Sequence, residues 1–279
     1  MLIDTHAHLN FNAFKGDADE VIRRSLDNNA RLINVGSQYE TSKRAVEIAE
    51  KYEKGTYAAI GLHPIHLATD LVKIKNDTEE IEIKTKEENF DYGKYRELAQ
   101  NPKVVAIGEV GLDYYWKPKT KKKLAEFKEK QRTVLCQQLK LAEELNLPVI
   151  FHCRMAHKDF IDFLKENEEL LPPAAVAHGF VGSTEDLKEY LNLGYYIGFN
   201  GIIFKKIEGI NFEENIKNTP LERILTETDC PYLIPPQQES RNEPLYLKYI
   251  VQKIAGIKNV DYEKIAEITT QNARNLFKI

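Results

Sequence analysis

The stretch VVAIGEV (104–110), followed by KLAEFKEKQRTVLCQQLKLAEEL (123–145) and PVIFH (148–152), carries the pattern that decides the fold. A short apolar run precedes a long amphipathic segment, and a second apolar run follows. The middle segment repeats its apolar residues at close to a 3.6-residue period, which predicts a helix over 123–145. A strand, a helix and a strand in this order predict two parallel strands joined by a crossover helix.

The same alternation continues on both sides of this stretch. Strands are expected at eight places: 2–8, 32–37, 57–63, 104–110, 148–152, 175–178, 195–199 and 224–228. Eight such units favour an α/β fold of the (β/α)8 TIM barrel type over an open doubly wound sheet. Because the chain shows no repeat of fixed period and no linker, we expect residues 1–279 to form a single domain.

The composition excludes several classes of protein. The chain has 279 residues, 29% of them charged, and a formal net charge of −4, so any contact with nucleic-acid phosphates must be local. Three cysteines do not make a disulfide framework and favour the reducing cytoplasm. No apolar run is long enough to cross a bilayer, the N-terminus does not resemble a signal peptide, and no obligate protein partner is evident.

Two segments depart from the alternation. Residues 70–91 carry eight acidic residues and four lysines, which predicts an exposed insertion or a loosely packed helical edge. Residues 114–123 join Tyr114, Tyr115 and Trp116 to five lysines directly after an expected strand. Such a segment either tracks a nucleic-acid backbone while its aromatic side chains stack on bases, or is an ordinary solvated loop.

His6 and His8 are the first candidates for chemistry. Residues two apart on a strand share a face, so both imidazoles are aimed at one point, as a metal ion requires. Active sites of (β/α)8 barrels lie at the C-terminal ends of the strands, and further candidates occupy such positions: His63, Glu109, His152, His178 and Asp229. Taken singly, Glu109 also fits an ion pair and Asp229 a turn. Their convergence on one barrel mouth predicts a metal site, and imidazoles with carboxylates favour Zn, Mn, Fe or Ni over Mg.

Seven ordered motifs resemble the TatD family of metal-dependent deoxyribonucleases, within the amidohydrolase-like barrels, over nearly the whole chain. The motifs are IDTHAHL (3–9), GLHP (61–64), GEVGLDY (108–114), FHCR (151–154), AHGF (177–180) with GS (182–183), ETDCPY (227–232) and RNEP (241–244). A lone His-x-His pair would be weak support, whereas seven motifs at barrel spacing are specific.

The resemblance implies a hydrolase of ester bonds that uses two divalent metal ions, drawn from Zn, Mn, Mg, Fe and Ni. One ion would be bound by His6, His8, Glu109 and Asp229, and the second by Glu109, His152 and His178. Glu109 would bridge the two ions, at the position where many related amidohydrolases use a carbamylated lysine. The family often has an acid after the arginine of FHCR; this chain has Met155, a departure that concerns the substrate contacts and not the ligands.

Two divalent ions about 3.5–4 Å apart share a water and lower its pKa, so that it attacks a phosphodiester phosphorus. Glu109 and Asp229 would be catalytic, with Asp229 also accepting the proton of the water. His63 and Arg154 are the candidates for holding the phosphate. Arg154 lies two residues after His152, and its planar guanidinium suits a phosphate.

Three functions are open on these grounds. The resemblance favours a deoxyribonuclease acting on DNA, with 3′–5′ exonuclease polarity. The alternative is a metal-dependent hydrolase of another ester or amide, such as D-aminoacyl-tRNA or a lactone. A barrel that only binds its ligand is disfavoured, because every proposed metal ligand is present.

Overall fold

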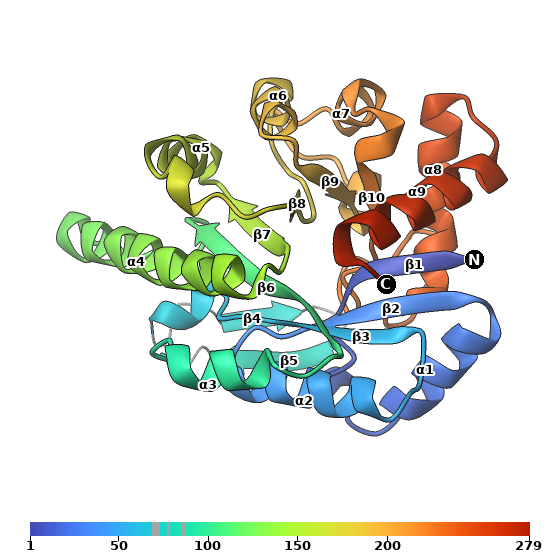
Figure 1. Ribbon diagram of the computed structural model, residues 1–279. Helices are drawn as coiled ribbons and strands as arrows, with labels where there is room; N and C mark the ends of the chain where they lie inside the picture. Colours follow the sequence, from blue (N-terminus) through green and yellow to red (C-terminus); the bar gives the residue numbers. More distant parts are fainter. Residues whose placement is uncertain (69–72, 77–78, 85–86) are drawn as a thin grey trace.

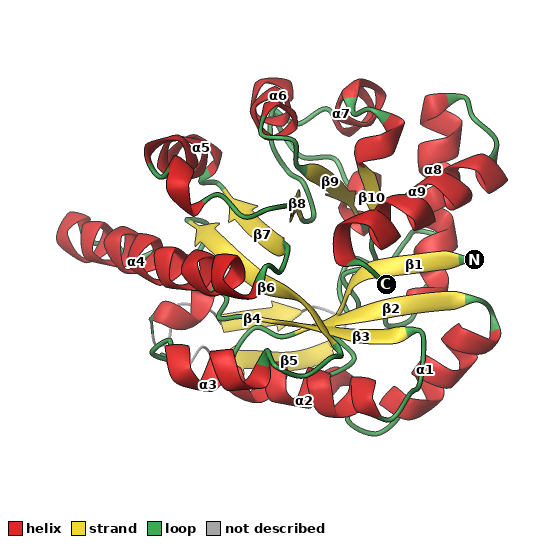
Figure 2. Ribbon diagram, viewed as in Figure 1, coloured by secondary structure: helices red, strands yellow, loops and turns green. Residues whose placement is uncertain are grey.

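The computed structural model of the protein describes residues 1–68, 73–76, 79–84 and 87–279, and it describes side chains outside 69–86 (Figure 1). Eight parallel strands form a nearly closed barrel in the order β1-β2-β3-β6-β7-β8-β9-β10 (Figure 2). Their bounds are β1 Leu2–Ala7, β2 Ala30–Val35, β3 Thr56–Ile60, β6 Val104–Asp113, β7 Val149–Arg154, β8 Ala175–Ala177, β9 Tyr196–Phe199 and β10 Ile224–Thr226. The predicted TIM barrel is confirmed, and each of the eight expected strands is present.

Helices cover the outside of the barrel (Figure 1). Their bounds are α1 Ala18–Asp27, α2 Tyr39–Glu50, α3 Tyr92–Leu98, α4 Lys121–Leu145, α5 His157–Glu166, α6 Thr184–Asn192, α7 Phe212–Asn218, α8 Leu247–Lys258 and α9 Tyr262–Phe277. The helix predicted over 123–145 is α4; the Thr120 side chain caps its start, and Asn146 ends it with a left-handed φ of 52°. In the part of the chain with described coordinates, no helix is both long and apolar enough to span a bilayer.

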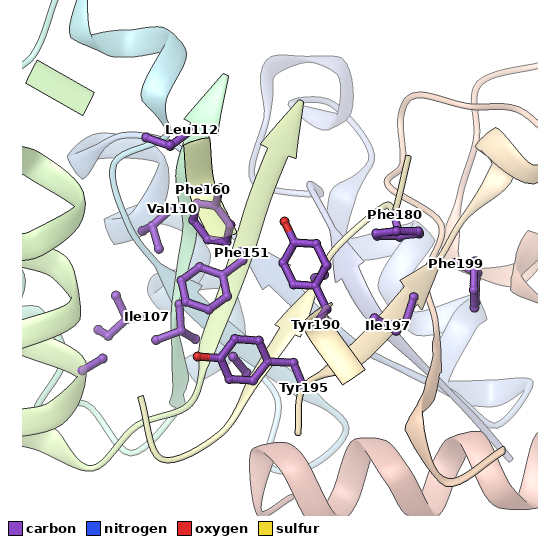
Figure 3. Close-up of a cluster of buried hydrophobic side chains, with 14 of the residues drawn as sticks. Ile107, Val110, Leu112, Phe151, Phe160, Phe180, Tyr190, Tyr195, Ile197 and Phe199 are labelled. Carbon is purple, nitrogen blue, oxygen red and sulfur yellow. The ribbon is translucent and has the colours of Figure 1, made fainter. Parts of the chain in front are cut away.

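The core has two main layers. Between strands and helices, Phe151 packs against Phe160 and Tyr195, with ring centroids 5.0 and 5.6 Å apart (Figure 3). Inside the barrel, side chains such as Ile33 and Ile150 form a separate buried cluster with residues from the end of α9. The C-terminal helix therefore packs against the barrel interior, which leaves the C-terminal ends of the strands for the polar residues.

The acidic segment 70–91 contains two strands that the sequence did not predict. β4 (Lys73–Asn76) and β5 (Glu79–Lys84) pair antiparallel, so the prediction of a helical edge is wrong there. A β-ladder satisfies the backbone of an inserted segment without the apolar stripe that a packed helix needs. The predicted exposure of residues 70–86 falls on side chains outside the described residues.

The barrel closes between β10 and β1 through very few backbone contacts. The end of β1 and the segment that follows β10 meet at an isolated parallel bridge between Ala7 and Cys230. His8 N donates to the Cys230 carbonyl at 2.9 Å, and Asp229 N donates to the His6 carbonyl at 2.8 Å. These bonds join residues more than 200 positions apart and bring Asp229 beside the His6/His8 pair.

Two buried glutamines of α4 hold the backbone beside the barrel mouth. Gln131 Oε1 accepts from Asp113 N and its Nε2 donates to Asp113 O, both at 2.9 Å. Gln138 bonds Leu62 N and O in the same way, at 2.7 and 3.1 Å. Because each amide satisfies both backbone groups of one residue, α4 fixes Asp113 and the residue that precedes His63.

Candidate metal centre

His6 and His8 lie at the mouth end of β1, and both side chains are buried. Their Nε2 atoms are 3.1 Å apart. His8 Nδ1 lies 2.8 Å from the Val35 carbonyl oxygen, so Nδ1 carries the proton and Nε2 presents a lone pair to the site. Two nitrogens on one tetrahedral zinc at ~2.0–2.1 Å would lie about 3.3 Å apart. The observed spacing therefore fits two ligands of one ion.

Regular strand alternation does not alone aim these side chains. The pairing of β1 with β2 shifts register between Asp4 and Ala7, around His6. The pairing of β6 with β7 shifts between Gly108 and Val110, at Glu109. Such bulges turn a side chain to a new direction and are common beside active sites.

Glu109 is the centre of the cluster and is only 5% exposed. Its Oε1 lies 2.6 Å from His152 Nδ1, 3.3 Å from His63 Nε2 and 3.5 Å from His178 Nε2. Its Oε2 lies 3.4 Å from His6 Nε2. Burial by itself would raise the pKa of Glu109, but the surrounding histidines hold that pKa well below its ordinary value. One ionised carboxylate thus faces histidines from four segments of the barrel.

His152 lies between two carboxylates. Its Nδ1 faces Glu109, and its Nε2 lies 3.0 Å from Oδ2 of the buried Asp113. Burial lowers the pKa of His152, but Glu109 and Asp113 outweigh burial and raise the pKa to about 9. A carboxylate that accepts a hydrogen bond from Nε2–H leaves Nδ1 as the atom available to a metal ion.

His178 repeats this arrangement with the opposite ring nitrogen. Its Nδ1 lies 2.8 Å from Oε1 of the buried Glu227, and its Nε2 faces Glu109. Burial lowers the pKa of His178, but Glu227 and Glu109 raise it to about 10. The Gly179 backbone N–H also donates to Glu227 Oε1 at 2.5 Å, which fixes the carboxylate.

Asp229 lies just beyond β10 with a left-handed φ of 58°. Its Oδ1 is 3.3 Å from His8 Nε2 and 3.9 Å from His6 Nε2. Burial would raise the pKa of Asp229, but hydrogen bonding to His8 and the charges of nearby histidines lower it. Tyr232 N also donates to the Asp229 carbonyl at 3.0 Å. The residue therefore opens a turn, as its sequence context allows, and also faces the His6/His8 pair.

His63 differs from the other histidines in its hydrogen bonding. Ile65 N donates to His63 Nδ1 at 3.1 Å, so in the neutral ring Nε2 carries the proton. Burial lowers the pKa of His63, which favours this neutral form. Its Nε2–H points at Glu109 Oε1 over 3.3 Å. His63 thus offers a hydrogen-bond donor to the site instead of a lone pair.

Arg154 ends β7 outside this cluster. Its guanidinium stacks over the Tyr115 ring, 3.7 Å from the centroid. Within the described residues it makes no ion pair and no side-chain hydrogen bond, so its donors are free. The structure therefore brings together His6, His8, His63, Glu109, His152, His178 and Asp229, and leaves Arg154 on the rim.

Three carboxylates of the site were not singled out as functional residues in the sequence. Asp113 and Glu227 orient His152 and His178, and Asp4 accepts from His6 N at 3.2 Å and from Thr228 N at 2.9 Å. A period-2 signal was available for all three, because Asp4 lies two residues before His6, Glu227 lies two before Asp229 and Asp113 lies four after Glu109. That signal does not say which histidine each acid contacts.

The donor set fits bound cations. Two groups, His6/His8/Glu109 and Glu109/His152/His178, each have candidate ligand atoms within 4.8 Å of one another, and they share Glu109. The raised pKa values of His152 and His178 have the same cause, since buried carboxylates favour positive charge at the mouth. That charge is held either as protons on imidazoles or as metal ions bound to them.

A (β/α)8 barrel with imidazoles and carboxylates gathered at its mouth defines the class of barrel metal-dependent hydrolases. A family described as TatD related DNase matches residues 3–278. The chain belongs to this TatD family of metal-dependent hydrolases, which act on ester bonds.

Relatives and solved structures agree over the full length. The chain is 40% identical to the uncharacterized metal-dependent hydrolase YabD of Bacillus subtilis, over 100% of both chains. It is 33% identical to the 3′-5′ ssDNA/RNA exonuclease TatD of Shigella flexneri, over 100% of this chain and 99% of that one. The structure of the TatD homolog YJJV from Escherichia coli has a TM-score of 0.80 at 29% identity, over 100% of this chain and 98% of that one.

More distant likeness concerns the fold alone. A structure engineered from a weak promiscuous lactonase template for organophosphate hydrolysis has a TM-score of 0.59 at 13% identity, over 99% of this chain and 95% of that one. It does not favour the alternative of a lactone or aminoacyl ester as substrate.

Proposed function

We propose that this chain cleaves phosphodiester bonds of DNA as a two-metal 3′–5′ exonuclease, and that residues 1–279 act as one domain. The observation that carries the proposal is Glu109, one carboxylate shared by two histidine groups. We assign one ion to His6, His8, Glu109 and Asp229, and the second to Glu109, His152 and His178. When bound, the ions would supply an acidified water and neutralise charge on the phosphate.

Asp229 is our candidate for the proton acceptor. Its side chain is 18% exposed, against 7% for Glu109, 2% for Asp113 and 1% for Glu227. A group that takes a proton from water must be reachable by water, and Asp229 is the most accessible of these acids. Its lowered pKa keeps it ionised.

His63 and Arg154 would hold the phosphate. The Nε2–H of His63 points into the cluster, so it can donate to a phosphate oxygen that displaces its contact with Glu109. Arg154 has free donors and lies two residues beyond His152 on β7. Its planar guanidinium can bind two phosphate oxygens at once.

Single-stranded DNA is the proposed substrate, supported by the TatD relatives named as 3′-5′ ssDNA/RNA exonucleases. The five lysines of 117–123 are exposed, and within the described residues none of them forms an ion pair. We propose that they track the strand, in the cytoplasm, where three free cysteines persist as thiols. We propose that the ions are drawn from Zn, Mn, Mg, Fe and Ni.

The test is cleavage of 5′-labelled single-stranded DNA by protein loaded with Mn²⁺ or Mg²⁺, beside D-aminoacyl-tRNA and a lactone. We expect a ladder that shortens from the 3′ end and no ester hydrolysis. Glu109→Gln should abolish the ladder, whereas Glu126→Gln, on the exposed side of α4, should leave it intact. Cleavage that survives Glu109→Gln, or ester hydrolysis without DNA cleavage, would overturn the proposal.

The role of the lysines is tested separately by salt dependence. Replacing all five with alanine should weaken binding of single-stranded DNA at low salt. If each contacts one phosphate, the slope of log affinity against log salt should fall by up to about 3.5. An unchanged slope and affinity would show that these lysines, on the loop before α4 and on its first turn, are only a solvated surface.

A further inference from the structure

Tyr115 and Arg154 form an exposed stack beside the metal centre. Tyr115 is 46% exposed, and the Arg154 guanidinium covers one side of its ring at 3.7 Å from the centroid. Tyr115 follows β6 and Arg154 ends β7, two strands whose C-terminal ends lie side by side (Figure 2). Met155, next in sequence, is 67% exposed. Among the described residues, Tyr115 and Met155 are two of the three large hydrophobic side chains that are exposed, and both lie on this rim.

The stack is tied to the metal centre through one buried carboxylate. Asp113 Oδ1 accepts from Tyr115 N at 2.8 Å, and its Oδ2 lies 3.0 Å from His152 Nε2. Gln131 of α4 holds both backbone groups of Asp113. The position of Tyr115 relative to His152 is therefore fixed by a short chain of hydrogen bonds, not left to a free loop.

We propose that the Tyr115–Arg154 stack is a nucleobase subsite that binds the base next to the phosphate being cleaved. This inference rests on the proposed nuclease function, and it describes how the proposed active site binds one base of its substrate. An aromatic ring and a guanidinium both present flat faces on which any base stacks. We assign the N–H donors of Arg154 to the phosphate, so the base is held by stacking alone and the subsite tolerates every base.

Arg223 and Tyr196 supply a matched control. They form the same kind of pair, with the guanidinium 5.2 Å from the ring centroid. Tyr196 begins β9, so this pair lies at the opposite end of the barrel from the metal centre. Arg223 is held by the Gly194 carbonyl at 2.8 Å. A general effect of replacing a stacked tyrosine should therefore appear at Tyr196 as well.

The test is binding of fluorescent single-stranded decamers to the full chain in EDTA, measured by anisotropy. One decamer is oligothymidylate and the other carries abasic residues of the same backbone. We expect Tyr115→Leu to weaken oligothymidylate binding about tenfold and abasic binding less than twofold. Tyr196→Leu should change neither. A 2-aminopurine at the 3′ end should be quenched on binding, and the quenching should be lost only in Tyr115→Leu.

The outcomes separate the subsite from the nuclease. Equal binding of both decamers by the wild type, or equal loss in both variants, overturns the subsite while 3′ cleavage leaves the nuclease intact. Selective loss in Tyr115→Leu without DNA cleavage under any metal supports the subsite and overturns the proposed reaction. Circular dichroism of both variants checks that each has folded.

Discussion

The two sides of the cluster are built differently. On the side of His152 and His178, the strands β6, β7 and β8 pair over several residues each, with one register shift at Glu109, and each histidine has a second carboxylate beside it. On the side of His6 and His8, β10 meets β1 at a single bridge. His8 is oriented by the Val35 carbonyl. Within the described residues neither His6 Nδ1 nor His178 Nδ1 makes a hydrogen bond of regular geometry, but His178 Nδ1 has a carboxylate oxygen of Glu227 at 2.8 Å.

This difference shows how the fold distributes charge. Carboxylate partners raise the pKa of His152 to about 9 and of His178 to about 10. Burial and the neighbouring His178 lower the pKa of His6 to about 4, against the pull of Glu109. The side of His152 and His178 therefore favours bound cations more strongly than the side of His6 and His8.

Replacing Glu109, the carboxylate shared by both sides, should remove the difference in cation binding between the two sides. Glu109→Gln takes a charged oxygen from both groups, so we expect both ions to be lost and DNA cleavage to fall by about 10³-fold or more. Elemental analysis after dialysis measures the metal, with Glu126→Gln as the control. Full metal content in Glu109→Gln would contradict the shared role.

Breaking the closure between β1 and the segment after β10 should lower the free energy of unfolding. Asp4 is fully buried and bonds His6 N, Thr228 N and Thr228 Oγ1. Asp4→Ala leaves buried donors unpaired, and we expect the free energy of unfolding to fall by about 3 kcal/mol. Urea denaturation in EDTA measures this, with the exposed Asp27→Ala as control. If both variants unfold alike, this closure is not held by Asp4.

Weakening the side of His152 and His178 should lower metal affinity more than it lowers the stability of the fold. Asp113→Asn keeps the size of the side chain but loses the charge that orients His152, so we expect metal affinity to fall by about 10–100-fold. Calorimetric titration gives the affinity, and Asp27→Asn is the matched control. A drop in thermal stability with unchanged metal affinity would give Asp113 a purely structural role.

If two ions bind as proposed, they should leave in a fixed order. No carboxylate is hydrogen-bonded to Nδ1 of His6 or His8 within the described residues, so stepwise chelation should release the ion of His6 and His8 first, at about tenfold lower chelator concentration. Cobalt-loaded protein reports this through two separable absorption changes. Release of both ions in one step would remove the expected asymmetry.

His66 serves as a reference for a buried histidine outside the metal-ligand cluster. Burial and the neighbouring His63 lower its pKa to about 3. Below pH 6.5 the unfolded chain binds a proton that the folded chain rejects, so stability falls as pH drops toward 3. His66→Leu should reduce this slope by about 1.4 kcal/mol per pH unit, measured by denaturation in EDTA. An unchanged slope would mean that His66 titrates normally.

The sequence by itself determined the eight strands, the barrel and most of the residues that meet at its mouth, but not Asp4, Asp113 or Glu227. These are properties of local pattern: alternation of apolar runs fixes the elements, and a position at a strand end fixes the edge of the sheet. It also placed both members of the His6/His8 pair toward one point, as their 3.1 Å separation requires.

Only the tertiary structure decided what each polar residue contacts. The proton positions on His63 and His8 depend on a backbone N–H and a carbonyl that no spacing rule supplies. The strands β4 and β5 form because they pair with each other, and no periodic sequence pattern predicts them. The Tyr115–Arg154 stack forms because the ends of two neighbouring strands lie close together. Such contacts join residues far apart in the chain, so they exist only once the barrel has closed and the bulges have turned their side chains.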